Sequence, residues 1–353
     1  MKKIITISLF SLNVFGVEPL YEFSDIHGFL PQEERATLKA EAEAINDTID
    51  VFKIKESEFD SNTAGFDALG DMKGFDFEFG YGMKYLYLHT TLNQKNLQYS
   101  GTTLTNNYFE LYGRYNILQF DKLALSLDVG YETNRAKDTY VRDSVAINDT
   151  IKRAFPDQTI TINNNILTQI NDGVTKTTNL TLDPYVAILD TKDEALYWRG
   201  IVSFWSNYTV TDIFGGYKQI KINNFIDSSI AHEIALQDDL QNGDLKATYK
   251  ASREDGMIFA GMSFGVRYEK FFTEFKYQYN KMLRVDCLKE MDVNHIVDVN
   301  FLYNITPSVG FYLGGHMMSN QFNGEIPYLY TKYTKTSFDH KYGYARTGLL
   351  FRF

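Results

Sequence analysis

Charged side chains recur at every second position in segments of this sequence whose other positions are apolar or aromatic. In "FDFEFGYGMKYLYL", Phe75, Phe77 and Phe79 alternate with Asp76 and Glu78, so an extended chain would have one apolar and one charged face. Carboxylates and bases gathered on a shared face could orient polar or charged solutes electrostatically. That chemistry requires no covalent step, and we expect no cofactor.

Candidate catalytic groups are few and poorly spaced. "GGHMMSNQF" places His316 three residues before Ser319 and Asn320, which faintly resembles the His-x-Ser-Asn of lipid A deacylases but is one residue too long. In a strand that spacing puts His and Ser on opposite faces. In "FDHKYG", Asp339 adjoins His340, whereas omptin-type proteases use an Asp and a His two apart. The remaining histidines lack the i, i+4 or His-x-His grouping of a metal site, so neither a catalytic nor a metal site is predicted.

Composition restricts the class of protein. The chain has 353 residues, a net charge of -10, 25 Tyr and 27 Phe, which is too aromatic for a disordered chain. The acidic balance argues against a nucleic-acid partner. The single cysteine, Cys287, excludes an intrachain disulfide and a Cys-rich zinc site. Beyond the N-terminus no window approaches the roughly 18 consecutive apolar residues of a membrane-spanning helix.

The N-terminus predicts export. "MKK" followed by the apolar "IITISLFSLNVFG" indicates a signal peptide over residues 1–16. In the segment 17–73 that follows, Leu38, Ala42 and Ile45 have helical spacing, which predicts an amphipathic helix over 32–49.

Downstream of residue 73 the period changes from 3.6 to 2. Ten alternating segments are predicted as strands: 75–87, 108–117, 123–132, 179–190, 195–210, 257–268, 271–281, 295–305, 308–318 and 341–353. Two weaker segments, 217–225 and 245–252, would raise the count to twelve, which we favour over ten. Short connections at 118–122, 190–194, 268–271 and 304–308 alternate with long polar ones at 92–106, 135–178, 211–256, 282–294 and 319–340.

Alternating strands, unequal connections, an export signal and a final strand "YARTGLLFRF" together resemble the bacterial outer-membrane β-barrel proteins, porin-like in size. The resemblance implies an all-β, antiparallel, up-and-down transmembrane barrel over residues 74–353, with residues 17–73 as a periplasmic segment. Its helix would rest at the barrel mouth or enter the lumen as a plug. In that group the last strand is a signal for the barrel assembly machinery, and here Leu349, Phe351 and Phe353 match its outward positions.

The charged face would then be the lumen. The residues predicted to line a pore are Asp76, Glu78, Lys84, Glu110, Arg114, Asp128, Glu132, Arg199, Arg267, Glu274, Lys276, Asp298 and Arg346. With Asp183 and Arg352 the lumen would hold eight acids and seven bases, a near balance that predicts weak ion selectivity. Aromatic residues near strand ends, such as Tyr85, Tyr87 and Tyr115, are predicted to form interfacial girdles.

These features predict a narrow outer-membrane channel for passive diffusion of small hydrophilic solutes rather than an enzyme. The alternative is a non-conducting structural or surface-interaction barrel with a closed lumen, and an outer-membrane lipid hydrolase comes third. Expected partners are outer-membrane lipid and lipopolysaccharide, the assembly machinery, small hydrophilic solutes and, in a homo-oligomer, further copies of the chain.

Overall fold

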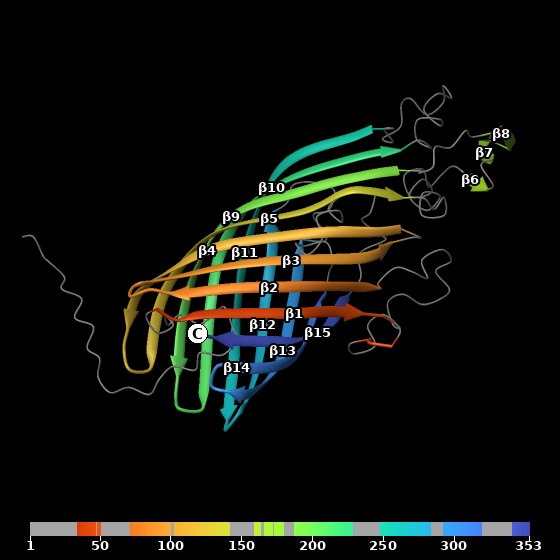
Figure 1. Cartoon of the computed structure of the whole chain (residues 1–353). Helices are drawn as coiled ribbons and strands as arrows, with labels where there is room; N and C mark the ends of the chain where they lie inside the picture. The colour runs from red at the N-terminus through yellow and green to blue at the C-terminus, as the bar shows by residue number, and fades with distance from the viewer. Residues whose placement is uncertain are drawn as a thin grey trace, which may run out of the picture.

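Twelve antiparallel strands close into a single barrel in the computed structural model of this chain (Figure 1). The structure describes residues 34–46, 48–50, 71–99, 102–141, 159–163, 166–171, 173–179, 187–228, 248–283, 292–319 and 341–353. The barrel strands are β1 (Ala36–Ile45), β2 (Met72–Gly82), β3 (Leu86–Tyr99), β4 (Thr102–Gln119), β5 (Leu123–Val141), β9 (Ala187–Trp205), β10 (Thr209–Ser228), β11 (Thr248–Tyr268), β12 (Phe271–Leu283), β13 (Val293–Thr306), β14 (Val309–Met318) and β15 (Tyr342–Arg352).

A second, three-stranded sheet lies in the connection between β5 and β9. It consists of β6 (Thr159–Asn163), β7 (Ile166–Asn171) and β8 (Val174–Asn179). Within the described residues no helix is long and apolar enough to cross a membrane.

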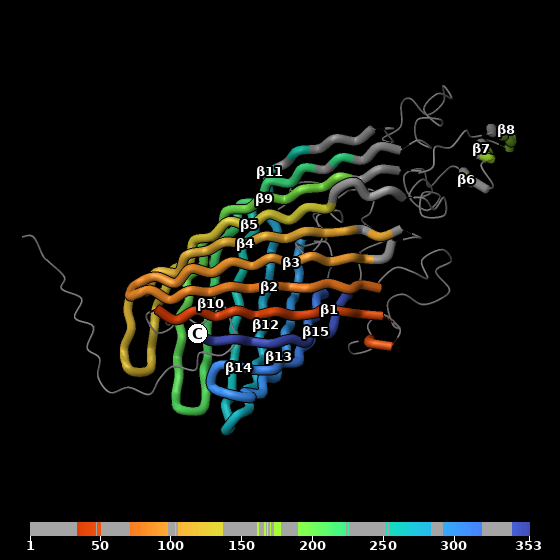
Figure 2. Tube along the Cα trace, in the orientation of Figure 1, coloured from red at the N-terminus to blue at the C-terminus, as the bar shows by residue number. Residues whose placement is uncertain are grey.

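Each barrel strand pairs with its neighbours in the sequence, and β15 pairs with β1 to close the ring (Figure 2). Thr37 lies opposite Arg352, and Phe353 exchanges backbone hydrogen bonds with Ala36 at 2.9 and 3.2 Å. The last strand therefore closes the barrel against β1, a segment that the sequence predicted to be helical, and not against the predicted first strand 75–87.

Connections differ sharply between the two ends of the barrel. One end has the tight turns 83–85, 120–122, 206–208, 269–270 and 307–308, and we call it the turn end. The opposite end, the loop end, has the longer connections 46–71, 142–186, 229–247, 284–292 and 319–341. The connection 100–101 between β3 and β4 is also at this end and is the exception, with two residues. Ala36 and Phe353 both lie at the turn end.

Strand length also divides the barrel. The consecutive strands β4, β5, β9, β10 and β11 have 18 to 21 residues, whereas the other seven have 10 to 14. A tilted strand needs about 9 to 11 residues to cross a bilayer. The five long strands therefore extend the wall well beyond that thickness on one side.

Alternation separates an apolar outer face from a polar interior. Phe75, Phe77 and Phe79 on β2 are each about half exposed on the outside, while Asp76 between them is 4% exposed. The same contrast recurs around the ring, with outward residues such as Ile213, Phe264, Phe275, Phe301 and Leu313. The predicted two-residue period and its apolar face are confirmed.

The predicted helix over 32–49 is wrong where the structure describes it. Ala36–Ile45 form β1, with Lys39, Glu41 and Glu43 turned inward and the intervening alanines outward. Ala, Glu and Lys favour helix locally, but the strand supplies hydrogen-bonding partners to both β2 and β15, which would otherwise be open edges. The barrel consequently begins at residue 36 rather than 74, so residues 36–45 are not part of a separate periplasmic segment.

Several predicted strand limits are corrected as well. The stretch 75–87 is not one strand, because the turn 83–85 divides it into β2 and β3. The predicted loop 92–106 is mostly strand, and the predicted turn 190–194 lies inside the uninterrupted β9. The weak segment 217–225 falls within β10, and the described part of 245–252 belongs to β11. The predicted total of twelve matches the structure because β9 and β11 were each predicted as two strands while β1 and β3 were not predicted as strands. Residues 1–16, Asp183, Cys287, Asp339 and His340 lie outside the described residues.

The interior at the turn end is a packed core. Its apolar cluster draws one residue from each of seven strands: Ala124, Trp205, Val210, Phe272, Leu302, Tyr312 and Leu350, all at most 5% exposed. Beside it, Ser203, Asp212 and Ser263 are 0% exposed, and Asp212 accepts hydrogen bonds from both serines. We call this apolar cluster, together with the buried polar residues at its level, the turn-end layer.

Candidate functional site

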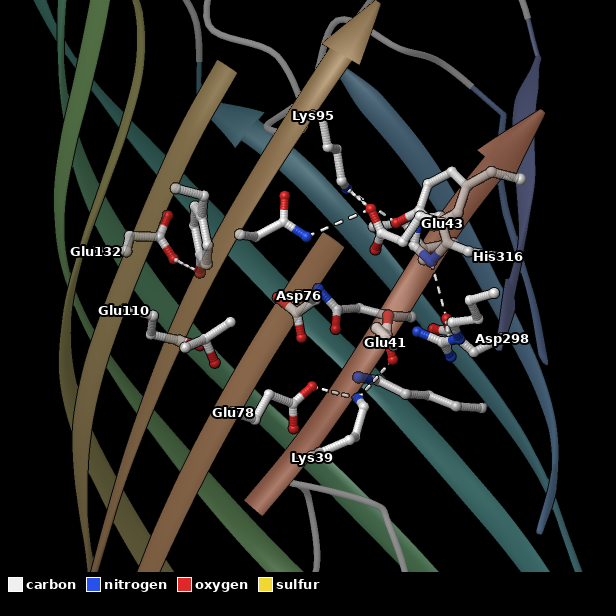
Figure 3. Close-up of a pocket in the computed structure, with 18 of the residues that line it drawn as sticks. Lys39, Glu41, Glu43, Asp76, Glu78, Lys95, Glu110, Glu132, Asp298 and His316 are labelled. Atoms are coloured by element: carbon white, nitrogen blue, oxygen red, sulfur yellow. Dashed lines mark hydrogen bonds and ion pairs between the residues drawn. The ribbon is translucent and has the colours of Figure 1, made fainter. Parts of the chain in front are cut away.

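A polar cavity of about 300 Å³ lies in the lumen on the loop side of the turn-end layer (Figure 3). Its walls come from nearly every part of the barrel, because inward side chains of β1 to β5 face those of β10 to β15 across it. The volume is at the lower end of the range for small-molecule sites. Because side chains alternate between the two faces of each strand, charged residues that are far apart in the sequence all point into the same cavity.

Acidic groups outnumber basic ones around this cavity. The described lining has eight carboxylates, Glu41, Glu43, Asp76, Glu78, Glu110, Glu132, Glu274 and Asp298. Five lysine and arginine side chains face them, Lys39, Lys95, Lys218, Lys276 and Arg346. The carboxylates therefore exceed the bases by three, whereas the sequence predicted a near balance for the lumen.

Most of the bases are engaged by lining carboxylates. Lys218 Nζ lies 2.6 Å from both carboxylate oxygens of Glu132, which lies on β5 across the intervening β9. Arg346 Nη2 lies 2.8 Å from Asp298 Oδ1, the oxygen that also lies 2.8 Å from His316 Nδ1. The Lys218–Glu132 and Arg346–Asp298 pairs each join strands that are separated by one intervening strand, whereas His316 and Asp298 lie on the paired strands β14 and β13.

On the β1 side, Lys39 is at the centre of a carboxylate group. Its ammonium lies 3.0 Å from Glu41 and in closer contact with Glu78, and it sits over the ring of Tyr312. Ligand atoms of Glu41, Asp76 and Glu78 lie within 4.8 Å of one another, a spacing that could suit a metal ion. Because Lys39 already contacts two of the three, we assign no metal to this group.

On the turn-end side of the cavity, Asp128 accepts hydrogen bonds from the guanidinium groups of Arg114 and Arg199. Arg114 Nε lies 2.7 Å from Oδ1, and Arg199 Nη2 lies 2.7 Å from Oδ2. Tyr87, Tyr112 and Tyr197 pack around them as a buried aromatic group. These charges belong to the packed interior, with exposures of 7% or less.

The predicted pore residues therefore fall into three groups. Those that line the cavity are Asp76, Glu78, Glu110, Glu132, Glu274, Lys276, Asp298 and Arg346. Arg114, Asp128 and Arg199 are buried beneath it, although Arg199 also lines a smaller adjoining hollow. Lys84 is exposed in the turn 83–85 beside Tyr85, and Arg267 lies at the turn end of β11, so neither lines the cavity.

Sequence reasoning missed Lys39, Glu41, Glu43, His89, Lys95 and Lys218 as lining residues. The first three were assigned to a helix, although their alternation with Ala40, Ala42 and Ala44 was a usable period-two signal. His89 and Lys95 lie on β3, which follows the turn 83–85 that the sequence did not reveal. Because of this turn, odd-numbered residues point outward on β2 and inward on β3. Tyr87 is therefore buried inside the barrel, whereas Tyr85 in the turn is exposed.

The hydrolase-like residues do not form a catalytic pair. Ser319 Oγ accepts a hydrogen bond from His295 N at 2.9 Å and donates to Asn294 Oδ1 at 3.3 Å. His316 instead faces the lumen, with Nδ1 beside Asp298 and its ring stacked on Tyr344. The nucleophile and the base are thus held in separate networks, and Asn320 lies outside the described residues.

Comparisons with known proteins give structural likeness without a family. No family model and no curated protein matches the sequence. Among solved structures, the translocator domain of autotransporter NalP from Neisseria meningitidis is similar, with a TM-score of 0.47, 7% identity, and coverage of 92% of this chain and 90% of that one. The NanC porin has a TM-score of 0.43, 8% identity, and coverage of 90% and 98%. An active-site mutant of outer membrane phospholipase A from Escherichia coli has a TM-score of 0.34, 8% identity, and coverage of 95% of both chains.

The fold itself is defined by the strand pairing of this chain. Twelve antiparallel strands close on themselves, the outer face is apolar, and the interior contains the packed turn-end layer and a polar cavity. Closure leaves no unpaired strand edge, which is the condition for a β-structure that spans a membrane. The architecture is that of a bacterial outer-membrane β-barrel.

Proposed function

We propose that this chain is an outer-membrane barrel whose lumen is closed to passive diffusion at its turn end, and that it acts through the cavity and the extended wall at its loop end. The observation that carries the proposal is the turn-end layer. Inward side chains there are at most 5% exposed in the apolar cluster and 0% exposed at Ser203, Asp212 and Ser263. Side chains with so little accessible surface leave no water-filled gap between them, and this packing supports a layer that blocks a diffusing solute.

Membrane embedding is part of the proposal and rests on the outer face. Large apolar side chains such as Phe77, Phe301 and Leu313 are about half exposed there. A soluble protein rarely exposes a contiguous apolar band of this kind, and in a bilayer the same band is buried in hydrocarbon.

The diffusion channel expected from the sequence stays a prediction that requires the turn-end layer to open. If it did open, the surplus of three carboxylates in the cavity above would favour cations over anions. A conducting state would therefore be cation-selective rather than nearly neutral.

Planar bilayers decide between the closed and the open barrel. We expect wild-type protein to give no conductance steps across a range of salt concentrations and voltages. Replacing Trp205 and Phe272 together by Ala removes two large buried side chains of the layer and should produce steps. The matched control, Phe77→Ala with Phe301→Ala, truncates two outward aromatics and should remain silent. Reproducible steps from wild-type protein would overturn the proposal.

A further inference from the structure

On one wall of the cavity, two side chains with hydrogen-bond acceptors lie side by side, and these acceptors have no donor among the described residues. Asp76 of β2 and Asn93 of β3 are directly opposite each other in the strand register, and both line the cavity. Opposed residues on one face have Cβ atoms about 4.5 to 5.5 Å apart. The two side chains therefore lie beside each other on the lining.

Asp76 is the more unusual of the two. Its side chain is 4% exposed, yet no hydrogen bond or ion pair joins its carboxylate to another described residue. Lys39, which could have served it, contacts Glu41 and Glu78 instead. Burying a carboxylate beside other carboxylates without a donor is costly, and a cation bound at this point would offset that cost.

Asn93 adds an acceptor of fixed orientation. Its Nδ2 donates to Glu43 Oε2 at 3.3 Å, which fixes the flip of the amide and leaves Oδ1 on the other side. Oδ1 is buried and has no hydrogen-bond partner among the described residues. Asp76 and Asn93 together therefore lack donors, and an ammonium group supplies three.

The cavity already holds ammonium groups by similar means. Lys95 Nζ lies 4.6 Å from the centre of the Tyr344 ring, 3.7 Å from Glu43 and 3.0 Å from the Tyr344 hydroxyl. Lys39 combines two carboxylates with the Tyr312 ring. Carboxylate and aromatic faces together are the recognised chemistry for organic cations.

From this geometry we propose that the luminal cavity is a binding site for a small organic cation, with one ammonium group bound between Asp76 and Asn93. The lining has three more carboxylates than lysine and arginine side chains, so the site favours a positively charged ligand. The cavity volume of about 300 Å³ restricts that ligand to a small molecule. This inference concerns binding and does not require the barrel to conduct.

Calorimetric titration of the purified barrel in zwitterionic detergent at low salt tests the site. The probes are putrescine, butanediol and succinate, which share a four-carbon chain and are dicationic, neutral and dianionic. We expect saturable binding of putrescine at one site per barrel and no binding of the other two. Equal binding of butanediol, or no putrescine binding, would overturn the proposal.

Variants locate the site within the barrel. Asp76→Asn should weaken putrescine binding about tenfold or more, because it removes the charge that accepts the ammonium protons. The control, Asp190→Asn, removes the same charge at a partly exposed carboxylate paired with Arg135, and should change affinity by less than about twofold. Unchanged affinity in Asp76→Asn would assign the binding elsewhere.

A gain-of-affinity variant protects the test against a folding defect. Asn93→Asp places a second carboxylate opposite Asp76 and should tighten putrescine binding severalfold. Weaker or equal binding by a correctly folded Asn93→Asp barrel would contradict the proposed position of the ammonium group. Because conductance is measured separately, failure of this site is distinguishable from failure of the closed-lumen proposal.

Discussion

Arg114 of β4 donates two hydrogen bonds to Asp128 of β5, from Nε at 2.7 Å and from Nη2 at 3.0 Å, and both side chains are almost completely buried. Arg199 of β9 donates to the same carboxylate from the other side. One acid thus joins three strands in the interior. This arrangement makes the lumen a structural core at this level rather than a passage.

Asp128→Ala should destabilise the barrel more than any exposed acid does. Removing the carboxylate leaves two buried guanidinium groups without their partner, and breaking a buried pair costs about 3 to 5 kcal/mol. Urea unfolding of the detergent-refolded protein measures the loss. Asp190→Ala, at a partly exposed pair with Arg135, should lose at most about 1 kcal/mol. Equal losses for the two variants would contradict the structural role of Asp128.

Gly130→Ala should destabilise the barrel because Tyr197 occupies the space beside Gly130. A methyl group at residue 130 would lie 2.6 Å from both Cε1 and Oη of Tyr197, which is closer than packed atoms allow. Overpacking of this kind costs about 1 to 3 kcal/mol. At Gly113 the nearest atoms are 3.7 Å away, so Gly113→Ala should change the free energy of unfolding by less than about 1 kcal/mol.

A double-mutant cycle tests the cause. In the Tyr197→Ala background the obstruction is gone, so the additional loss from Gly130→Ala should largely disappear. An undiminished loss in that background would locate the strain in the backbone of β5 instead.

The sequence was informative where a local rule decides the outcome. Alternation at Phe75 to Phe79 predicts an outward apolar row and an inward Asp76 because the side-chain period of a strand is two. The same rule predicts the orientation of side chains on the final strand, where Leu350 is buried and Leu349 is exposed. Weak alternation in 217–225 revealed β10, but the total of twelve was reached only because β9 and β11 were each counted twice and β1 and β3 were missed.

The sequence was uninformative where distant contacts decide. β1 has the composition of a helix and is extended because β2 and β15 both pair with it. The turn 83–85 contains no Pro, Asn or Asp, and missing it reversed the face assigned to Tyr87. The turn-end layer brings Trp205 of β9, Phe272 of β12 and Leu350 of β15 into one cluster, and no local pattern encodes contacts between strands so far apart in the sequence.

A charge on the outer face should distinguish an embedded barrel from a soluble one. Phe77→Arg places a guanidinium in the middle of the apolar band, where Arg costs about 2 to 4 kcal/mol in a bilayer. Val174→Arg, in the separate sheet β6 to β8, alters a residue that is 69% exposed and should cost less than about 0.5 kcal/mol. Unfolding of the barrel from lipid vesicles measures both, and similar small losses would argue against embedding at Phe77.

Phe353→Ala should impair assembly of the barrel while leaving its stability intact. The side chain is 70% exposed, and its main chain bonds to Ala36 through backbone atoms that Ala would retain. The refolded variant should therefore lose less than about 0.5 kcal/mol of stability, as exposed substitutions do. In cells, an altered assembly signal should reduce the folded outer-membrane fraction severalfold, measured by heat-dependent gel mobility. Tyr268→Ala truncates another aromatic that is 70% exposed at the turn end and should assemble normally. If both variants assembled equally well, Phe353 would act as an ordinary surface aromatic and not as a signal.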